Sequence, residues 1–370
     1  MYRIILLALL IPVQLSGQNI SGIIRDIGNR QPVEFATVYI NGTSIGTISS
    51  EAGVFELNGI VTPCQVVVSH VSYLPEILTI EDSDTDSLLI FLSPKKIEIE
   101  QLEISDKNLR EKNVAFFANE LLGYNNLGRS AYIQNDSVLR FNVEHHENPT
   151  IIKPKYFEAK ASAPIKIWLE LLGYMVHLDL IKFKFTTPLI NEETPDRSIT
   201  NILGKSYYIP IDSVSKRKAR IYEKNRKAAY YNSRQHFYRS ISQDELHENG
   251  YSIIGEEGAS LDIYIIRKDD YILISGLKGK RFYITYYCDL YGNPLTVSID
   301  SLSGNNIIRK RNGAAAREYD IFTSDIQFLN DQCIIRSTGS SPANSILFGG
   351  PIGEKRVGTT LPSNYFPDSD

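Results

Sequence analysis

The sequence predicts a mainly β protein with α+β character, in which an N-terminal antiparallel β-sandwich is followed by an α+β domain with a long basic helix. Two observations predict this fold class. From Asn19 to about Ser93, short apolar strands alternate with turn residues, and no helical pattern intervenes. Between Lys216 and Ser242, apolar residues recur at helical spacing among nine lysines and arginines. The 370 residues are enough for two domains, and the 42% of apolar and 22% of charged residues are typical of globular proteins.

Residues 1–18 are predicted to be a signal peptide. Arg3 supplies a positive start, residues 4–13 are apolar, and the small residues 16–17 precede a cleavage point near Gln18. The apolar stretch is about half as long as the roughly 20 residues that a membrane-spanning helix needs. A buried N-terminal strand is the alternative. We therefore expect an exported protein, in the periplasm, on the periplasmic face of the outer membrane or at the cell surface.

Residues 19–95 form the predicted sandwich. Residues 20–25 alternate apolar and polar side chains, and Val33–Ile40 is rich in β-branched and aromatic residues. Further strands are expected at 54–57, 65–71 and 88–92. Three glycines are predicted to be structural turn residues, because tight turns need a positive φ or a close chain approach: Gly42, Gly46 and Gly53.

The same segment carries several ordered motifs. They are SGIIRD at 21–26, PVEFATVYI at 32–40, GTSIGT at 42–47, SEAGVF at 50–55 and VVSHVSY at 67–73. In this order they resemble the carboxypeptidase regulatory-like domain, although Ser72 stands where that family usually has glycine. The resemblance covers about 75 residues. It implies a transthyretin-like β-sandwich of seven strands with a structural or accessory role.

Residues 96–125 are predicted to be a linker made of a strand and a helix. Ile97, Ile99, Leu102 and Ile104 could form the strand. From Asp106 to Leu122 the apolar residues can share one helical face, and Gly123 is a natural stop.

Residues 126–370 form the predicted α+β domain. Strands are expected at 137–143, 156–161, 261–267, 271–274, 281–288 and 295–299, and an irregular tail from Gly339 onward. Residues 169–185 could be a strand pair or a helix, since their periodicity favours neither.

The basic helix predicted over Lys216–Ser242 supplies the candidate site. This segment contains nine lysines and arginines but a single acidic residue, Glu223. Its expected buried stripe is Ile221, Ala228, Ala229, Phe237 and Ile241. The candidate anion- or partner-binding residues are Arg217, Arg220, Lys224, Arg226, Lys227, Arg234, His236 and Arg239. The tyrosines 222, 230, 231 and 238 lie between the cations and would suit an interface. The alternative is a solvated helix face that binds nothing.

The expected partner is an envelope component: anionic lipid, the phosphates of lipopolysaccharide, or an acidic protein. Nucleic acid is not expected, because the net charge is −4 and the protein is predicted to be exported. Cys288 and Cys333 could form a disulfide in an oxidising compartment, or all three cysteines could be buried small hydrophobes.

No catalytic residue, metal ligand or cofactor motif is predicted. The sequence has no GxSxG elbow, HExxH motif, P-loop or dinucleotide fingerprint. His145 and His146 are adjacent, so on a strand they would point to opposite faces.

NRKAAY at 225–230, SRQHF at 233–237 and LPSNY at 361–365 resemble uncharacterised exported proteins of Gram-negative bacteria that carry the same N-terminal module. We therefore expect a non-enzymatic accessory or binding protein of the cell envelope. The alternative is a hydrolase of envelope peptides or glycans that uses the sandwich as an accessory domain.

Overall fold

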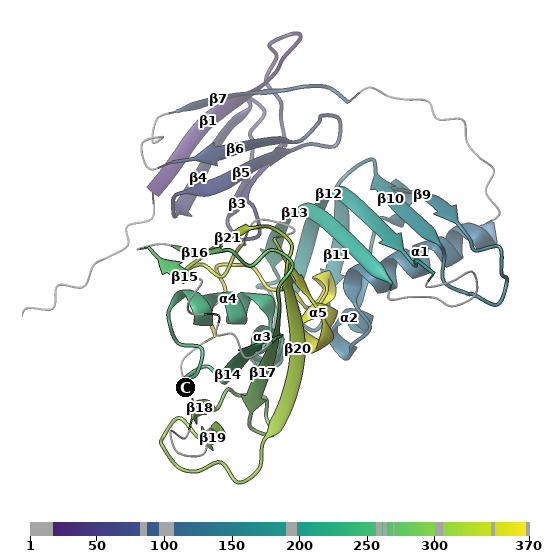
Figure 1. Cartoon of the computed structure of the whole chain (residues 1–370). Coiled ribbons are helices and arrows are strands. Elements are labelled where there is room, and N and C mark those ends of the chain that lie inside the picture. Colours follow the sequence, from purple (N-terminus) through teal and green to yellow (C-terminus); the bar gives the residue numbers. More distant parts are fainter. Residues whose placement is uncertain are drawn as a thin grey trace, which may run out of the picture. The chain divides into compact units, whose positions relative to one another are not determined.

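The computed structural model describes residues 18–81, 87–95, 107–189, 198–256, 261, 265–268, 271–299, 306–341 and 345–367. Residues 1–17 of the predicted signal peptide and the predicted strand at 97–104 lie outside these residues, whereas Gln18 belongs to the first strand. By its contacts the chain divides into two compact units (Figure 1). The first comprises Met1–Asn41 and Ile45–Lys96, and the second comprises Gly42–Ser44 and Ile97–Asp370.

The described residues of the first unit form seven strands, the number that the resemblance implies, although the sequence pattern located only five of them. They are β1 (Gln18–Asp26), β2 (Thr37–Ile40), β3 (Gly46–Ile48), β4 (Val54–Ile60), β5 (Cys64–Ser69), β6 (Glu76–Ile80) and β7 (Leu88–Leu92). One sheet has the order β4-β1-β7 and the other β3-β2-β5-β6. Only the pairing of β1 with β7 is parallel. Ile24, Val38, Phe55 and Val66 are buried in one apolar cluster, so the predicted sandwich is confirmed.

Asp26 joins two of the sandwich motifs. Its side chain accepts hydrogen bonds from the backbone N–H of Gly28 at 2.7 Å and of Asn29 at 3.1 Å, which closes the turn after β1. The Tyr73 hydroxyl donates to the other carboxylate oxygen at 3.0 Å. The bond from Asn29 holds the pKa of Asp26 below its usual value. The first and last motifs are therefore linked through one carboxylate.

The three predicted turn glycines differ in the structure. Gly42 and Gly53 have positive φ angles, of 77° and 73°. Gly46 instead lies inside β3, where it pairs with Tyr39. A strand residue needs no positive φ, so the turn prediction for Gly46 is corrected.

The second unit begins with a six-stranded sheet and its covering helix. The elements are α1 (Lys107–Leu122), α2 (Asn126–Ser130), β8 (Ala131–Ile133), η1 (Asp136–Val138), β9 (Leu139–Glu144), β10 (Tyr156–Ala161), β11 (Ile165–Leu169), β12 (Tyr174–Thr186) and β13 (Ile199–Pro210). The strand order is β8-β11-β12-β10-β9, and β13 pairs with β12 along its length. Helix α1 packs Phe117 against Phe183, with ring centroids 4.7 Å apart. Residues 169–185 are therefore strands with a turn between them.

A β-bulge in β12 explains why its periodicity was ambiguous. Buried side chains fall on Tyr174, Val176 and Leu178, and then on Phe183 and Phe185. The pairing with β13 shifts between Leu180 and Lys182, so one extra residue moves the buried positions from even to odd numbers.

The rest of the second unit, as far as the structure describes it, combines three α-helices and a short 3-10 helix with three smaller sheets. Its elements are α3 (Lys216–Tyr230), α4 (Arg234–Ser242), β14 (Tyr251–Gly255), β15 (Ile265–Arg267), β16 (Tyr271–Ser275), β17 (Arg281–Cys288), β18 (Thr296–Ile299), β19 (Asn306–Arg309), β20 (Asp320–Phe328), β21 (Gln332–Arg336), β22 (Ile346–Phe348), α5 (Gly350–Glu354) and η4 (Val357–Thr359). The sheets are β14-β17-β20-β22, β15-β16-β21 and β18-β19. Phe237 and Ile241 of α4 are buried in their core. The tail from Gly339 is more regular than predicted, since it contains β22, α5 and η4.

The single long basic helix was a wrong prediction, because the chain breaks after Tyr230. Asn232 has a φ of 54°, in the left-handed region that asparagine tolerates better than most residues. The Ser233 side chain then caps α4 by accepting from the His236 N–H at 3.1 Å.

The predicted disulfide does not form. Cys288 ends β17 and Cys333 lies on β21, which belongs to another sheet, and both thiols are free. The Cys333 sulfur lies 3.5 Å from the Ser341 hydroxyl. Burial raises the pKa of the Cys288 thiol to about 11. Both residues are thus buried small hydrophobes, the alternative that the sequence left open.

Candidate functional site

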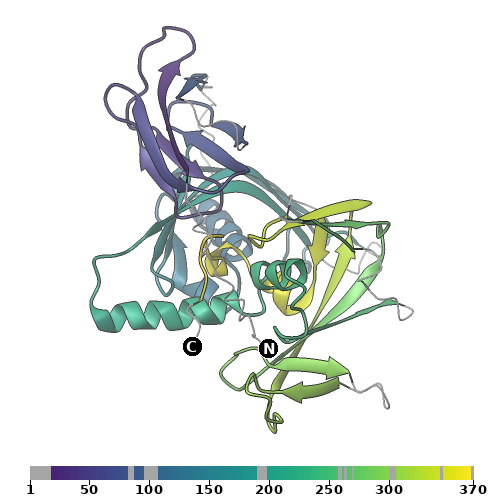
Figure 2. The same cartoon turned by 90° about the vertical axis from the view of Figure 1, so that its left-hand side faces the viewer.

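Helix α3, the long teal-green helix in Figure 2, carries a cluster of cations in the second unit. It begins after Ser215, whose side chain accepts from the Lys218 N–H at 3.3 Å. No glycine or proline interrupts residues 216–230, and Tyr222, Ala229 and Tyr230 provide the buried side. Ile221 and Ala228, which we predicted to be buried, are exposed instead.

Five cations of α3 are exposed to solvent: Lys216, Arg217, Lys218, Arg220 and Lys224. In the part of the chain that the structure describes, the only polar or ring contact of these five side chains is that of Lys218, whose ammonium lies 5.6 Å from the centre of the Tyr222 ring. Three of the five stand in the first helical turn, where the helix dipole disfavours positive charge by about 0.3–1 kcal/mol each. This arrangement lowers the stability of the helix and attracts anions.

Arg226 points inward and fastens α3 to the turn between β11 and β12. Its guanidinium donates to the Leu172 carbonyl at 2.8 Å and lies 4.2 Å from the Tyr174 ring centre. Lys227 is half-buried. Glu223 accepts a hydrogen bond from the Tyr365 hydroxyl at 2.7 Å. Arg226 and Lys227 therefore do not belong to the exposed cationic face, which corrects our grouping of them with Arg217, Arg220 and Lys224.

Two of the three predicted site residues on α4 are buried. Arg239 is 2% exposed and donates to the carbonyls of Ser363 at 2.7 Å, Tyr365 at 2.8 Å and Thr338 at 3.1 Å. Arg234 is exposed over the Phe348 ring. The prediction that all of these residues form one anion-facing surface is therefore wrong, because His236 and Arg239 of α4 are buried in the core.

His236 is enclosed by aromatic rings. Its Nδ1 accepts hydrogen bonds from the Tyr251 hydroxyl at 2.9 Å and the Asn232 N–H at 3.3 Å. Burial lowers the pKa of His236 to about 3, with a smaller effect from Lys355 and other cations. The interleaved tyrosines 222, 230 and 238 are also buried and Tyr231 is half-buried, so they form core rather than an exposed interface.

We expect His236 to make folding sensitive to acid. Its folded pKa of about 3 lies below the value of about 6.5 in an unfolded chain, so acid protonates the unfolded state first. The stability that neutral His236 contributes is complete above pH 6.5 and is lost as the pH falls toward 3. From about pH 7.5 to about pH 5, the wild type should lose about 2 kcal/mol more unfolding free energy than His236→Gln. Urea unfolding at both pH values measures this difference, and equal losses would contradict it.

A hollow of about 350 Å³ lies beside the first turns of α3. Its lining consists of Glu170, Leu171, Ser215, Arg217, Lys218, Ile221 and Tyr222. Two cations thus face one carboxylate, and Leu171 and Ile221 add an apolar wall. The sequence did not predict this hollow, since residues 170–171 and 215–222 meet only in the fold.

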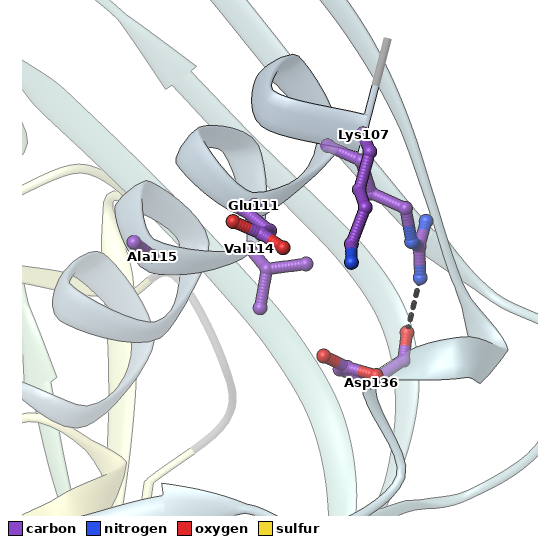
Figure 3. A pocket seen from close by; sticks show the side chains of 6 residues that line it. Lys107, Glu111, Val114, Ala115 and Asp136 are labelled. Atoms are coloured by element: carbon purple, nitrogen blue, oxygen red, sulfur yellow. Dashed lines mark hydrogen bonds between the residues drawn. The ribbon is translucent and has the colours of Figure 1, made fainter. Parts of the chain in front are cut away.

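A second hollow of about 340 Å³ lies beside the start of α1 (Figure 3). Lys107 and Arg110 face Glu111 and Asp136 there, so its charges balance. The Arg110 guanidinium donates to the Asp136 carbonyl at 2.8 Å, the bond that Figure 3 shows. Neither hollow has His236 in its lining. The hollow beside α3 has two cations and one carboxylate in its lining, so it is the better candidate for binding an anion.

Within the described residues, no three or more His, Cys, Asp or Glu side chains come together as a metal site would require. Among the same residues, no helix has both the length and the apolar character needed to cross a membrane.

Comparison with known proteins supports the N-terminal assignment. Residues 20–104 match the family model of the CarboxypepD_reg-like domain, which confirms the resemblance predicted from the motifs. No curated protein matches the chain. A solved structure described as a membrane-associated protein of unknown function, from Bacteroides fragilis, is 10% identical and aligns over 87% of this chain and 97% of that one. Its TM-score is 0.17, too low to carry an argument about fold or function.

Proposed function

We propose that the protein is an exported, non-enzymatic accessory protein of the cell envelope that binds a phosphate-bearing lipid surface through α3. The observation that carries the proposal is the set of five exposed cations on this helix, four of which have no polar or ring partner among the described residues. The CarboxypepD_reg-like sandwich would serve as a structural or docking module.

The charge pattern supports an anionic surface as the ligand. The chain as a whole has a net charge of −4, so attraction to anions must come from a local cluster. Each Lys or Arg close to an anionic membrane contributes about 1 kcal/mol to the free energy of binding. This attraction fades beyond a Debye length of about 8 Å at physiological salt. A row of exposed cations along one helix suits such a contact.

The test is binding to vesicles. The full-length mature protein is mixed with vesicles of phosphatidylglycerol and phosphatidylcholine, and separately with phosphatidylcholine alone. The variant Lys216→Glu/Arg220→Glu/Lys224→Glu should bind the anionic vesicles at least about 100-fold more weakly than the wild type. These three residues lie outside the lining of the hollow.

A matched control changes the net charge by the same amount elsewhere on the second unit. Lys112 of α1, Lys160 of β10 and Lys278, between β16 and β17, are exposed and belong to other elements than α3, so their replacement by Glu should leave binding within about threefold of the wild type. Equal binding by the wild type and the α3 variant would overturn the proposal. An equal loss in the control would show that only the net charge matters, which also contradicts a specific α3 surface.

A further inference from the structure

Two turns meet at one end of the second unit. The first, residues 289–293, joins β17 to β18, and the second, residues 310–314, follows β19. Thr296 at the start of β18 pairs with Arg309 at the end of β19, so both turns lie at the same end of this hairpin. Figure 1 shows β18, β19 and one end of β20 together in the bottom part of the view. We call residues 289–293 and 310–314 together the double turn.

The first turn exposes two apolar side chains on a fixed backbone. Leu290 is 60% exposed and Tyr291 is 89% exposed. The Asp289 carboxylate accepts a hydrogen bond from the Tyr291 N–H at 2.9 Å. The hydroxyl of the buried Tyr286 donates to the Gly292 carbonyl at 3.2 Å. These bonds hold the turn against the sheet while both apolar side chains stay in water. Large apolar side chains presented in this way favour a partner that removes them from water.

The second turn exposes two cations beside the first. A hydrogen bond of 2.8 Å from the Lys310 N–H to the Ala314 carbonyl closes it. Lys310 and Arg311 are exposed, and within the described ranges of the chain neither side chain forms a hydrogen bond or an ion pair. Burial lowers the pKa of His236, and Arg311 is among the cations that lower it further. The ring of His236 lies 5.9 Å from that of Tyr286, which also holds the first turn, so the two turns are neighbours.

The surrounding surface has the same character. Residues 306–322 carry four exposed cations and two exposed carboxylates, namely Arg309, Lys310, Arg311 and Arg317 against Glu318 and Asp320. Ile321 is 54% exposed and pairs with Tyr287 near the end of β17. Exposed apolar side chains bordered by cations are typical of segments that lie at the surface of an anionic bilayer. Neither of the two hollows described above has a residue of the double turn in its lining. The double turn is therefore suited to enter a soft surface rather than to enclose a small ligand.

We propose that the double turn inserts into the headgroup layer of an anionic bilayer, with Leu290 and Tyr291 among the first acyl carbons and Lys310 and Arg311 on the lipid phosphates. Tyrosine suits this depth, because its ring is apolar and its hydroxyl can stay hydrated. The inference rests on the proposed function in taking a lipid surface as the partner. It adds an apolar contact that the cations of α3 do not supply and that salt does not screen.

The first experiment follows insertion directly. Trp168 is the only tryptophan of the chain, so Tyr291→Trp in a Trp168→Phe background gives the full-length mature protein a single fluorescent reporter. With vesicles of phosphatidylglycerol and phosphatidylcholine, its emission should shift to the blue, and bromine atoms on the acyl chains should quench it. Ile152→Trp in the same background is the matched control, because Ile152 is 91% exposed and lies between β9 and β10. A reporter at residue 291 that stays in water, or one at residue 152 that shifts equally, would overturn the proposal.

Vesicle binding measures the contribution of each turn. Leu290→Ser/Tyr291→Ser should bind the same vesicles about 30-fold more weakly than the wild type, because two apolar side chains no longer leave water. Lys310→Gln/Arg311→Gln should also lose a factor of about 30 at low salt. Only this second variant should show a flatter dependence of affinity on salt. Wild-type affinity in Leu290→Ser/Tyr291→Ser would contradict the proposal.

The same variants distinguish a bilayer from a second copy of the chain. If the wild type is a dimer that Leu290→Ser/Tyr291→Ser converts to a monomer in size-exclusion chromatography, the double turn is an interface between copies and the lipid proposal is refuted. Ile152→Ser should bind vesicles within about threefold of the wild type. An equal loss in Ile152→Ser would mean that any exposed apolar residue adsorbs to lipid, which also contradicts a specific double turn.

The two proposals can fail separately. If the reporter at residue 291 stays in water while vesicle binding still depends on Lys216, Arg220 and Lys224, the double turn is refuted and the α3 surface stands. If the reporter enters the bilayer while the α3 variant binds vesicles normally, the double turn is the membrane contact and the α3 surface is refuted.

Discussion

Arg239→Ala should lower the free energy of unfolding of the second unit by about 4 kcal/mol. The Arg239 guanidinium is buried and donates to the carbonyls of Thr338, Ser363 and Tyr365. Its carbon atom Cζ also lies 3.7 Å from the Phe366 ring centre. Removing the side chain would leave buried carbonyls without donors and a cavity beside α4, and each effect is destabilising.

The loss should be greatest at the C-terminal tail. Ser363, Tyr365 and Phe366 all contact Arg239, and these contacts hold the tail against α4. Urea unfolding measures the overall loss, and limited proteolysis followed by mass spectrometry should show faster cleavage near residue 365. Arg220→Ala is the control, because Arg220 is an exposed cation and its loss should cost less than about 0.5 kcal/mol. Similar stability of the two variants would refute the role assigned to Arg239.

The sandwich could be predicted from sequence because its determinants are local. Gly53 and the Asp26 turn each lie within a short motif, and the strand that follows Gly53, Val54–Ile60, alternates between exposed and buried residues over its first four positions. Helix α1 was predicted as well, but only part of its expected apolar face is buried: Phe117 and Leu121 lie in the core, whereas Leu109 is 46% exposed.

Strand β13 was not predicted because its residues show no alternation. Nearly all of Ile199–Pro210 is half-buried, and only Tyr208 is fully buried. A period of two arises when one face of a strand is buried and the other is solvated, so a strand with both faces half-covered lacks that pattern. Its existence depends on pairing with β12, which is a tertiary effect.

The candidate site was predicted in part. The cations of α3 were identified from composition, but composition does not say which of them face inward. Helical spacing does place Arg226 on the same face as Tyr222 and Tyr230, both of which are buried. No local pattern could show that the carbonyl partners of Arg239 lie about a hundred residues farther along the chain, or that Glu170 would meet Arg217.

Gly53→Ala should destabilise the sandwich by about 3 kcal/mol. Gly53 has a φ of 73°, which an L-residue with a side chain adopts at a cost of about 1–2 kcal/mol. A Cβ at this position would also lie 2.5 Å from the Ile24 carbonyl oxygen, so backbone must move. The neighbouring bonds would be strained, because Ile24 donates to the Gly53 carbonyl at 2.9 Å and its own carbonyl accepts from Val33 at 3.0 Å.

Hydrogen exchange in the full chain measures this loss within the sandwich alone. The slowest amides of β1 and β4 should exchange about 100-fold faster in Gly53→Ala, since each 1.4 kcal/mol corresponds to about a factor of ten. Gly59→Ala is the matched control, because Gly59 lies in the same unit and has a similar φ of 72° but no atom within 4 Å of the new Cβ. Only the cost of the positive φ remains at that position, so the exchange rates of the same amides should rise about tenfold or less. Equal effects in the two variants would mean that the positive φ alone, and not the approach to Ile24, makes Gly53 necessary in the sandwich.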